Sequence, residues 1–277
     1  MNKWISGLLI GWALSGSLAI AQETAVLTPT VDEIVAKANR VAYYQGKDGK
    51  SKVQMTITDK QNRTRNREFN ILRQNTPDTE DQKYFVYFQA PADVRRMVFM
   101  VHKHADVEKD DDRWLYLPNL DLVRRIAAGD KRTSFVGSDF LYEDVSGRSL
   151  LEDTHELLRV TEDRYVIKNV PKKPETVEFS YYLVYIDKKT YMPMKMEYFE
   201  KDDKSYRIIE SQKLEMVKAT EDGKEVEYPT VTRSVVKDLK SGSTTEMVFS
   251  EVQYNIDLSD DIFTERFLKR PPREAMR

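Results

Sequence analysis

The sequence contains no cysteine, and this absence excludes three kinds of chemistry. Without a thiol the chain has no disulfide, no cysteine nucleophile and no cysteine to carry a lipid anchor. Histidine is scarce, with three residues in 277, and the motifs of nucleotide-binding loops and of serine or zinc hydrolases are missing. The chain also shows no internal repeat and no low-complexity linker.

An excess of charge of one sign is lacking as well. The chain carries 44 basic and 46 acidic residues, which gives a formal net charge of -2 at pH 7. This balance provides no electrostatic reason to bind nucleic acid or an anionic membrane. A mean hydropathy of -0.62 beside 15 tyrosines, 11 phenylalanines and 10 methionines indicates a well-solvated exterior around a bulky interior.

The longest apolar run lies at the N-terminus. Lys3 gives a basic start, residues 4–20 are apolar, and Ala19-Ile20-Ala21 fits the small-x-small rule for cleavage. The pattern predicts a secretory signal peptide over residues 1–21 and a single periplasmic domain over residues 22–277 that does not span a membrane. The alternative, an uncleaved anchor, is disfavoured because glycines and serines interrupt the apolar run.

An amphipathic helix is predicted over residues 31–44. Thr30 and Glu33 have the spacing of a capping box, in which each side chain accepts a hydrogen bond from the other residue's backbone. Apolar residues then recur at helical spacing and form one stripe. The residues of this stripe are Ile34, Val35, Ala38, Val41 and Ala42.

The rest of the chain reads as strands. Val53, Met55 and Ile57 alternate with polar residues, which is typical of a half-buried strand. Short strands joined by turns, with few helix signals between them, indicate one antiparallel sheet. Further strands are predicted over residues 68–71, 84–88, 98–102, 114–117, 122–126, 165–169, 177–187, 192–200, 206–217, 230–238 and 245–254. Residues 260–270 are expected to form a helical turn with packed phenylalanines.

The stretch from Trp114 to Val145 is the most informative part of the chain. It reads WLYLP over residues 114–118, RRI over residues 124–126 and SFVGSDFLYED over residues 134–144. In this order the segments resemble the LolA-like outer-membrane lipoprotein-sorting family. The resemblance implies a mainly β (α+β) fold, a curved antiparallel sheet that forms an incomplete β-barrel covered by an N-terminal helix and short helical loops.

The same resemblance implies a function. Members of the family are periplasmic carriers of lipid or lipoprotein acyl chains, which implies no enzyme activity, no cofactor and no metal. It also suggests an inner-membrane transporter of the RND or MMPL type as a partner. Hopanoids, glycerophospholipids, glycolipids and lipoproteins all remain open as cargo.

Two strand faces are candidate walls of a lipid cavity. An acyl chain of about 16 carbons costs on the order of 12 kcal/mol to expose to water, so its binding surface must be concave and covered. Flexible methionines and aromatic rings suit such a surface, although ordinary core packing is the more common fate of a methionine stripe. The first candidate face comprises Met192, Met194, Met196 and Tyr198, and the second comprises Phe179, Tyr181, Leu183 and Tyr185.

A lid and a latch are expected at the open side of the barrel. The helix over residues 31–44 would be the lid, through Ile34, Val35 and Val41. Arg124 and Arg125 point in opposite directions on a strand, and in the LolA-like interpretation one of them pins the acidic loop. Its candidate partners are Asp139, Glu143 and Asp144. The alternative is a solvated charge pair that contributes about 0 to 1 kcal/mol.

The faces of the strand at 114–117 are both apolar. Trp114 and Tyr116 share one face and are further candidates for lipid contact, although the sequence does not show which face looks into a cavity.

Two weaker patterns keep other function classes open. Arg63, Arg65 and Arg67 recur at strand spacing and form either a docking stripe or a solvated edge. His102 and His104 alternate near several aspartates, but the stretch does not spell out a metal site. A non-catalytic interaction scaffold of the cell envelope is therefore the main alternative to a carrier, and a metal-dependent periplasmic hydrolase is a weaker one.

Overall fold

Thirteen antiparallel strands form one continuous sheet in the described part of the chain. The computed structural model describes Met1 and residues 29–277, so the predicted signal peptide and its cleavage site lie outside the described residues. The strands of the first half are β1 (Asp48–Thr58), β2 (Thr64–Asn75), β3 (Gln82–Ala90), β4 (Val98–Lys103), β5 (Asp112–Leu117) and β6 (Leu122–Arg125). Those of the second half are β7 (Asp153–Val160), β8 (Arg164–Pro171), β9 (Tyr181–Asp187), β10 (Pro193–Phe199), β11 (Ser205–Glu221), β12 (Lys224–Asp238) and β13 (Ser243–Tyr254).

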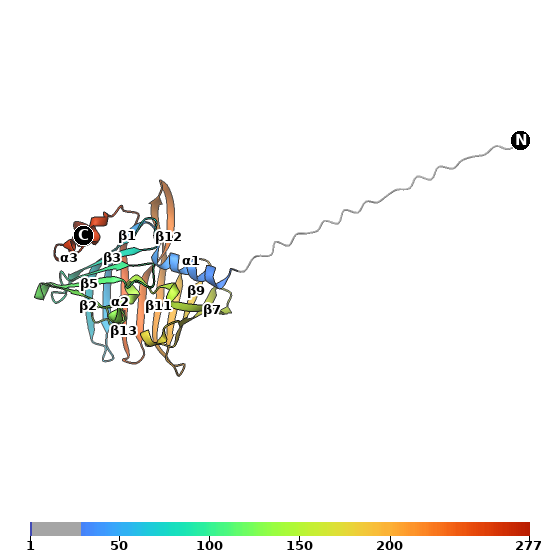
Figure 1. Cartoon of the computed structure of the whole chain (residues 1–277), viewed down its shortest axis with the longest axis horizontal. Coiled ribbons are helices and arrows are strands. Elements are labelled where there is room, and N and C mark those ends of the chain that lie inside the picture. The colour runs from blue at the N-terminus through green and yellow to red at the C-terminus, as the bar shows by residue number, and fades with distance from the viewer. Residues whose placement is uncertain (2–28) are drawn as a thin grey trace.

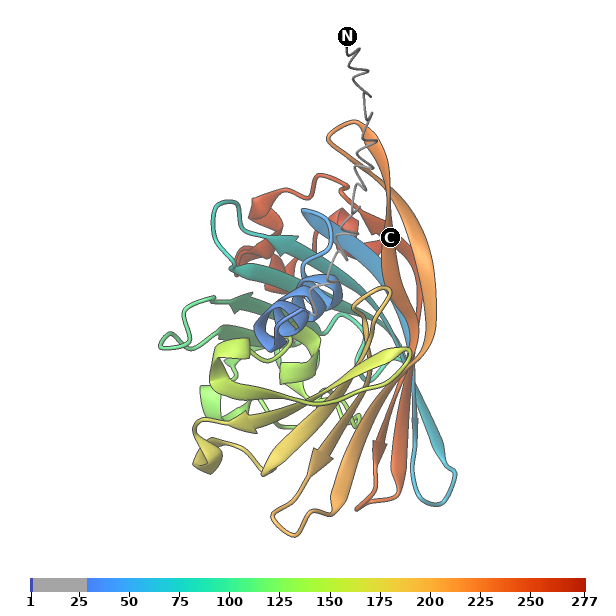
Figure 2. The same cartoon turned by 90° about the vertical axis from the view of Figure 1, so that its right-hand side faces the viewer.

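The strand order explains the shape of the molecule. The sheet runs β6-β5-β4-β3-β2-β1-β13-β12-β11-β10-β9-β8-β7, so the two ends of the strand sequence, β1 and β13, pair at its centre. The edge strands β6 and β7 are not paired to each other, and the curved sheet stays open on that side (Figures 1 and 2). The prediction of an incomplete antiparallel barrel is therefore confirmed.

The helix α1 (Val31–Tyr43) lies across the open side of the sheet (Figure 2). Its capping box forms as predicted, because the Thr30 hydroxyl accepts from the backbone N–H of Glu33 and the Glu33 carboxylate accepts from that of Thr30. Ile34, Val35 and Ala38 are buried on its inner face. The amphipathic helix and its apolar stripe are thus confirmed. None of the described helices has the length and apolar character that a membrane span requires.

The connection between the two edge strands fills much of the concave side. This plug segment, residues 126–152, contains the short helices η2 (Ala128–Asp130), α2 (Tyr142–Ser146) and η3 (Leu150–Glu152). Its aromatic residues Phe135, Phe140 and Tyr142 are buried against the inner faces of the sheet. The inward residues of β1 that the sequence predicted, including Val53 and Met55, belong to the same core.

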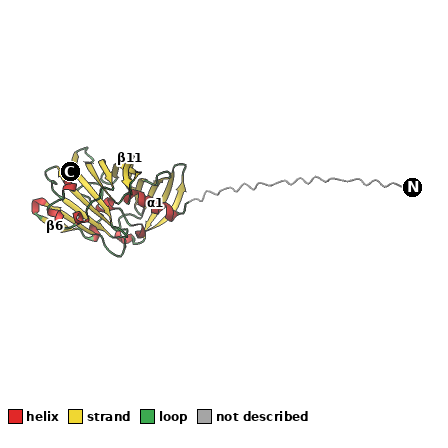
Figure 3. Cartoon of the chain, turned by 90° about the horizontal axis from the view of Figure 1, so that it is seen from above, coloured by secondary structure: helices red, strands yellow, loops and turns green. Residues whose placement is uncertain are grey.

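The C-terminal residues cover the part of the opposite, convex face that β2 to β5 form. This strap, residues 255–277, contains η5 (Asp260–Phe263), α3 (Arg266–Lys269) and α4 (Arg273–Met276). Phe263 and Leu268 of the strap are buried in a second core against β2, β3, β4 and β5. The remaining short helices are η1 (Pro118–Leu120) and η4 (Pro174–Thr176). Figure 3 shows how small the helical share is beside the sheet.

Candidate functional site

A cavity of about 380 Å³ lies between the concave face of the sheet, α1 and the plug segment. This volume falls within the range of about 300 to 1,000 Å³ that is typical of small-molecule sites. Strands from both halves of the sheet contribute to its mainly apolar walls. The apolar lining includes Val35, Ala38, Ile71, Val86, Phe135, Phe140, Ile167, Val184, Ile186, Met192, Met196, Ile209, Met247 and Phe249.

The predicted methionine face of β10 lies largely on this cavity. Met192, Met196 and Tyr198 line it, together with Pro193. Met194 does not, because the pairing of β10 with β9 shifts between Pro193 and Lys195. Such a bulge inserts one extra residue and interrupts the alternation of faces.

The structure corrects the predicted aromatic face of β9. The inner face carries Tyr182 and Val184, which lie opposite residues of the β10 wall. Tyr181, Leu183 and Tyr185 lie on the outer face and do not line the cavity. Both faces of this strand are apolar, so alternation identifies the strand without showing which face is inward.

Lysine side chains cover the outward tyrosines of β9. The ammonium of Lys168 lies 4.5 Å from the ring centre of Tyr181, and that of Lys195 lies 5.1 Å from that of Tyr185. In each pair the ammonium lies over the face of the ring, which is the geometry of a cation–π contact. The outer rings therefore belong to a solvated surface.

Phe179 precedes β9 and supports the wall without lining it. Its side chain is buried, and its ring centre lies 5.4 Å from that of Tyr182 and 5.3 Å from that of Tyr198. The guanidinium of Arg132 lies 4.8 Å from the same ring. Phe179 thus joins the cavity wall to a charged cluster of the plug segment.

Trp114 and Tyr116 face away from the cavity. Both are buried on the convex side, in the core that β2 to β5 form with the strap. The edge of the Trp114 ring meets His102, whose imidazole Nε2 lies 2.7 Å from the carbonyl oxygen of Phe263. The inner partner on this strand is Leu115, which packs against the concave core. These two aromatic residues are corrected from cavity candidates to anchors of the strap.

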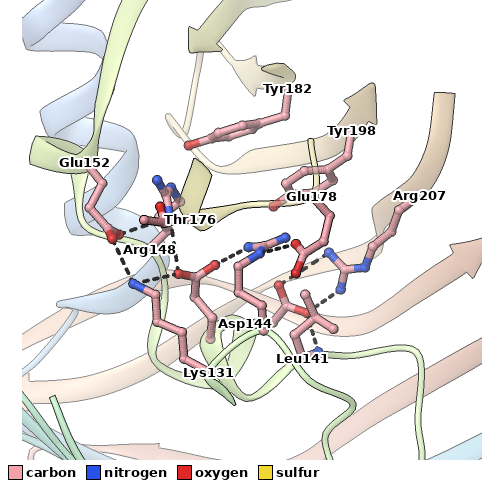
Figure 4. Close-up of polar contacts among 12 residues, drawn as sticks. Lys131, Leu141, Asp144, Arg148, Glu152, Thr176, Glu178, Tyr182, Tyr198 and Arg207 are labelled. Atoms are coloured by element: carbon pink, nitrogen blue, oxygen red, sulfur yellow. Dashed lines mark hydrogen bonds and ion pairs between the residues drawn. The ribbon is translucent and has the colours of Figure 1, made fainter. Parts of the chain in front are cut away.

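The predicted arginine latch is also corrected. Arg124 and Arg125 are exposed and pair with Asp130 and Asp112, away from the acidic loop. The residue that holds Asp144 is Arg207 of β11 (Figure 4). Arg207 also donates a 3.1 Å hydrogen bond to the backbone carbonyl of Asp139. The plug segment is therefore fixed to the far half of the sheet.

Glu143 is the centre of a buried ion-pair cluster in the plug segment. The guanidinium of Arg132 forms an ion pair with its carboxylate. The ammonium of Lys131 lies 3.3 Å and the guanidinium of Arg148 lies 3.4 Å from the same carboxylate (Figure 4). Burial alone would raise the pKa of the Glu143 carboxyl, but the three cations outweigh it and hold that pKa below its ordinary value.

The cluster extends to the wall of the cavity. Arg148 pairs with Asp153 at 2.9 Å, and the hydroxyl of Tyr182 donates to the same carboxylate at 2.8 Å. Burial is the main cause that raises the pKa of Tyr182, and the neighbouring Asp153 charge adds to it. The hydroxyl thus remains protonated, and the polar end of the cavity is fully hydrogen-bonded at this corner.

Further hydrogen bonds join the plug segment to the central strands. The carboxylate of Asp139 accepts from the hydroxyls of Ser243, and of Thr245 at 2.7 Å. Arg65 donates at 3.2 Å to the backbone carbonyl of Gly137. Because the contacts come from β2, β11 and β13, the plug segment bridges both halves of the sheet.

Two cations hold helix ends, Arg73 at the end of α1 and Lys103 at the end of α2. Arg73 donates from Nη1 to the backbone carbonyl of Tyr43 at 3.0 Å and from Nη2 to that of Gln45. Lys103 donates at 2.9 Å to the carbonyl of Ser146, the last residue of α2. Burial lowers the pKa of the Lys103 ammonium to about 8. Both cations satisfy carbonyl groups that helix ends leave free.

Comparison with known proteins identifies the family. A family model whose description reads "uncharacterized protein" matches residues 80–270, which is more than half of the chain. A structure of a DUF1329 family protein from Desulfovibrio piger is 27% identical, covers 87% of this chain and 100% of its own, and has a TM-score of 0.76. The chain belongs to the LolA-like family.

Two further LolA-like structures share the fold. One, from Vibrio parahaemolyticus, is described as a domain of an outer membrane lipoprotein-sorting protein; it is 23% identical, with 86% and 97% of the chains covered and a TM-score of 0.73. The other is the LolA superfamily protein NE2245 from Nitrosomonas europaea, 17% identical, with 87% and 100% covered and a TM-score of 0.62. No curated protein matches the chain.

The remaining patterns of this LolA-like chain have structural partners. Of the arginine stripe, Arg63 pairs with Asp59 at 2.7 Å and Arg67 pairs with Asp93 at 3.2 Å. His104 lies 3.3 Å from Asp112. Across residues 29–277 no group of three or more histidine and acidic side chains is placed to hold a metal ion.

Sequence reasoning missed the arginines that fix the plug segment. Arg148 lies five residues from Glu143 and Asp153, whereas Arg132 lies 11 residues from Glu143 and 46 from Glu178, and nothing in these spacings distinguishes the two arginines from solvated charges. Arg207 gave a usable signal, because it shares a strand face with the apolar Ile209. A single arginine among inward apolar positions predicts a buried partner of opposite charge.

Proposed function

We propose that this protein is a periplasmic carrier that binds the acyl chains of a lipid or lipoprotein in the cavity. The observation that supports the proposal is the 380 Å³ space with mainly apolar walls, closed by α1 and the plug segment. Burial of each methylene group contributes about 0.8 kcal/mol, so even part of one acyl chain supplies several kcal/mol.

The lining also suits a variable cargo. Met192, Met196 and Met247 line the cavity with side chains that have three rotatable bonds and a polarizable sulfur. Such a surface adapts to chains of different length and branching. The carrier would hold its cargo by shape and apolar area, with few directional bonds.

We also propose a location and a partner, which the sequence and the family support. A signal peptide over residues 1–21 would deliver residues 22–277 to the periplasm as a single domain, and the cysteine-free chain would carry no lipid anchor. One relative is described as an outer membrane lipoprotein-sorting protein domain. We therefore place the protein between the envelope membranes, with an inner-membrane transporter of the RND or MMPL type as its donor or acceptor.

A matched pair of variants tests the carrier function. Val184→Trp places an indole on the inner face of β9, whereas Leu183→Trp places the same group on the outer face of the same strand. Protein purified without detergent from the periplasm is analysed by native mass spectrometry and lipid extraction. The wild type and Leu183→Trp are expected to carry lipid, and Val184→Trp is expected to lose at least about tenfold of it, because the indole occupies the cavity.

Other outcomes would reject the carrier. If the wild type carries no lipid and takes up none from vesicles, the cavity has no acyl cargo and an interaction scaffold becomes the better interpretation. Equal lipid content in both variants would show that lipid binds elsewhere.

A further inference from the structure

The two edges of the open sheet differ in how they are protected. β6 has four residues, follows Pro118 closely and ends in Arg124 and Arg125. Short length, nearby proline and charge are common means of preventing edge-to-edge pairing. β7 has eight residues with the sequence DTHELLRV, without lysine, proline or glycine, and β8 is its only strand neighbour among the described residues.

Exposed apolar side chains gather at this second edge. Leu158 is 52% exposed and Val160 is 47% exposed, both on β7. Val170 of the neighbouring β8 and Leu151, just before β7, are exposed as well. An unpaired strand with exposed aliphatic residues is a template for pairing with another chain.

The sequence of β7 is complementary to itself. If two copies pair antiparallel about a twofold axis between Leu157 and Leu158, Leu157 of each copy lies opposite Leu158 of the other. The same register places Glu156 of each copy opposite Arg159 of the other. Shifting the axis by half a residue to either leucine removes this charge pairing, so the register is specified.

The two charges are free to pair with another copy. Glu156 and Arg159 are both exposed, and neither has an ion-pair partner within 4 Å among residues 29–277. A bulge at Leu158 separates them, because the pairing of β7 with β8 shifts between Leu157 and Arg159. The bulge interrupts the pairing at one point of the strand, and the segments on both sides of it stay paired with β8.

We propose that β7 is the interface of a homodimer in which the sheets of two copies join edge to edge. Backbone hydrogen bonds between the two β7 strands provide the pairing, and the Glu156–Arg159 contacts occur twice because the axis is twofold. The dimer leaves the cavity and the strap of each copy uncovered, so it is independent of the proposed carrier function.

Charge reversal tests the interface through a distinctive pattern. Glu156→Lys places a lysine opposite Arg159 and should weaken dimerisation by roughly tenfold or more, and Arg159→Glu should do the same. An equimolar mixture of these two variants restores both complementary pairs and should dimerise, as should the double variant. Light scattering after size exclusion measures the mass, and Glu215→Lys, an exposed strand charge on β11, is the control.

Introduced cysteines test the register, since the natural chain has none. Under mild oxidation, a mixture of Glu156→Cys and Arg159→Cys should form a disulfide-linked dimer, while each variant alone should form far less. A monomeric wild type over the accessible concentration range overturns the proposal. A dimer that both single charge reversals leave intact also overturns it, because the contact would then lie elsewhere.

Discussion

At the scale of single residues, Gly147 stands where the plug segment meets α1. Its backbone has φ +77° and ψ 150°, a region that is essentially restricted to glycine. A Cβ atom there would lie 2.7 Å from the ring of Tyr43. The flat contact between a glycine and an aromatic ring lets the helix rest directly on the plug segment.

Gly147→Ala is therefore expected to lower the free energy of unfolding by about 3 kcal/mol, through backbone strain and displacement of the buried ring. Gly223→Ala is the matched control, since Gly223 also has φ +77° but nothing within 4 Å of its Cβ position. The control should lose about 1 kcal/mol. Urea denaturation measures both, and equal losses would contradict a steric role for Tyr43.

Glu143 gives the plug segment a dependence on pH. Its pKa lies below the ordinary value of 4.5 in the folded protein, so its contribution is fully present above pH 4.5. That contribution is lost as the pH falls through the folded pKa. Glu143→Gln should cost about 3 to 5 kcal/mol at pH 7, because Arg132 and Arg148 lose their shared buried carboxylate.

Unfolding by urea between pH 7 and pH 3 tests the direction of this pH dependence. The difference between wild type and Glu143→Gln should shrink below about pH 4.5, because the carboxyl of the unfolded wild type takes up a proton there and that of the folded protein does so only at lower pH. Glu225→Gln, which removes an exposed ion pair with Lys218, should cost less than about 1 kcal/mol. A difference that stays constant down to pH 3 would show that the charge of Glu143 does not contribute to the free energy of unfolding.

At the scale of elements, the sequence predicted where a strand runs better than which way it faces. The helix over residues 31–44 and the alternation at Val53 and Met55 were predicted correctly, because one face of each is apolar and the other polar. β9 reads YYLVYID and is apolar on both faces, so its orientation depends on tertiary packing alone.

One strand escaped prediction altogether. β7 contains Glu156, Leu157, Leu158 and Arg159, which are residues that favour helices, and its bulge disrupts a period of two. Pairing with β8 overrides this local preference. The arginines that fix the plug segment escaped as well, because their partners are chosen by the fold and leave no mark in the spacing of the sequence.

The strap offers a test at the same scale. Phe263 is 1% exposed and packs on the convex face of the sheet, so Phe263→Ala should cost about 3 to 5 kcal/mol. Phe267 is only partly buried there, and Phe267→Ala should cost clearly less. Equal losses would contradict the view that η5 is the anchor of the strap.

Fluorescence reports on the strap directly. The other two tryptophans of the chain, Trp4 and Trp12, belong to the predicted signal peptide, so Trp114 would be the only one in the mature protein. It lies beneath the strap and is 6% exposed. Phe263→Ala should shift its emission to longer wavelength before global unfolding, whereas Phe267→Ala should shift it less.

At the scale of the whole molecule, the open sheet has two sides that the chain closes differently. On the convex side, the strap covers β2 to β5 through a continuous apolar core. On the concave side, α1 and the plug segment surround a cavity, and they meet the sheet through buried apolar residues as well as through buried ion pairs and hydrogen bonds. In the proposed carrier function, cargo would occupy this cavity in the folded protein only.

Cargo binding should therefore stabilise the whole fold. Delipidated protein given an acyl lipid at one hundred times its dissociation constant should gain about 2.7 kcal/mol. For a chain of this size that gain corresponds to an increase of about 5 to 10 °C in melting temperature. Leu183→Trp should show the same increase and Val184→Trp almost none, because only the second indole occupies the cavity.

Scanning calorimetry of three single variants, Leu183→Trp, Val184→Trp and Glu156→Lys, separates cargo binding from dimerisation. Glu156 lies on the outer edge of the sheet and does not line the cavity, so its variant should keep the full increase even as a monomer. An increase that survives in Val184→Trp would place the lipid outside the cavity. An increase that disappears in Glu156→Lys would mean that the cavity holds cargo only in the dimer.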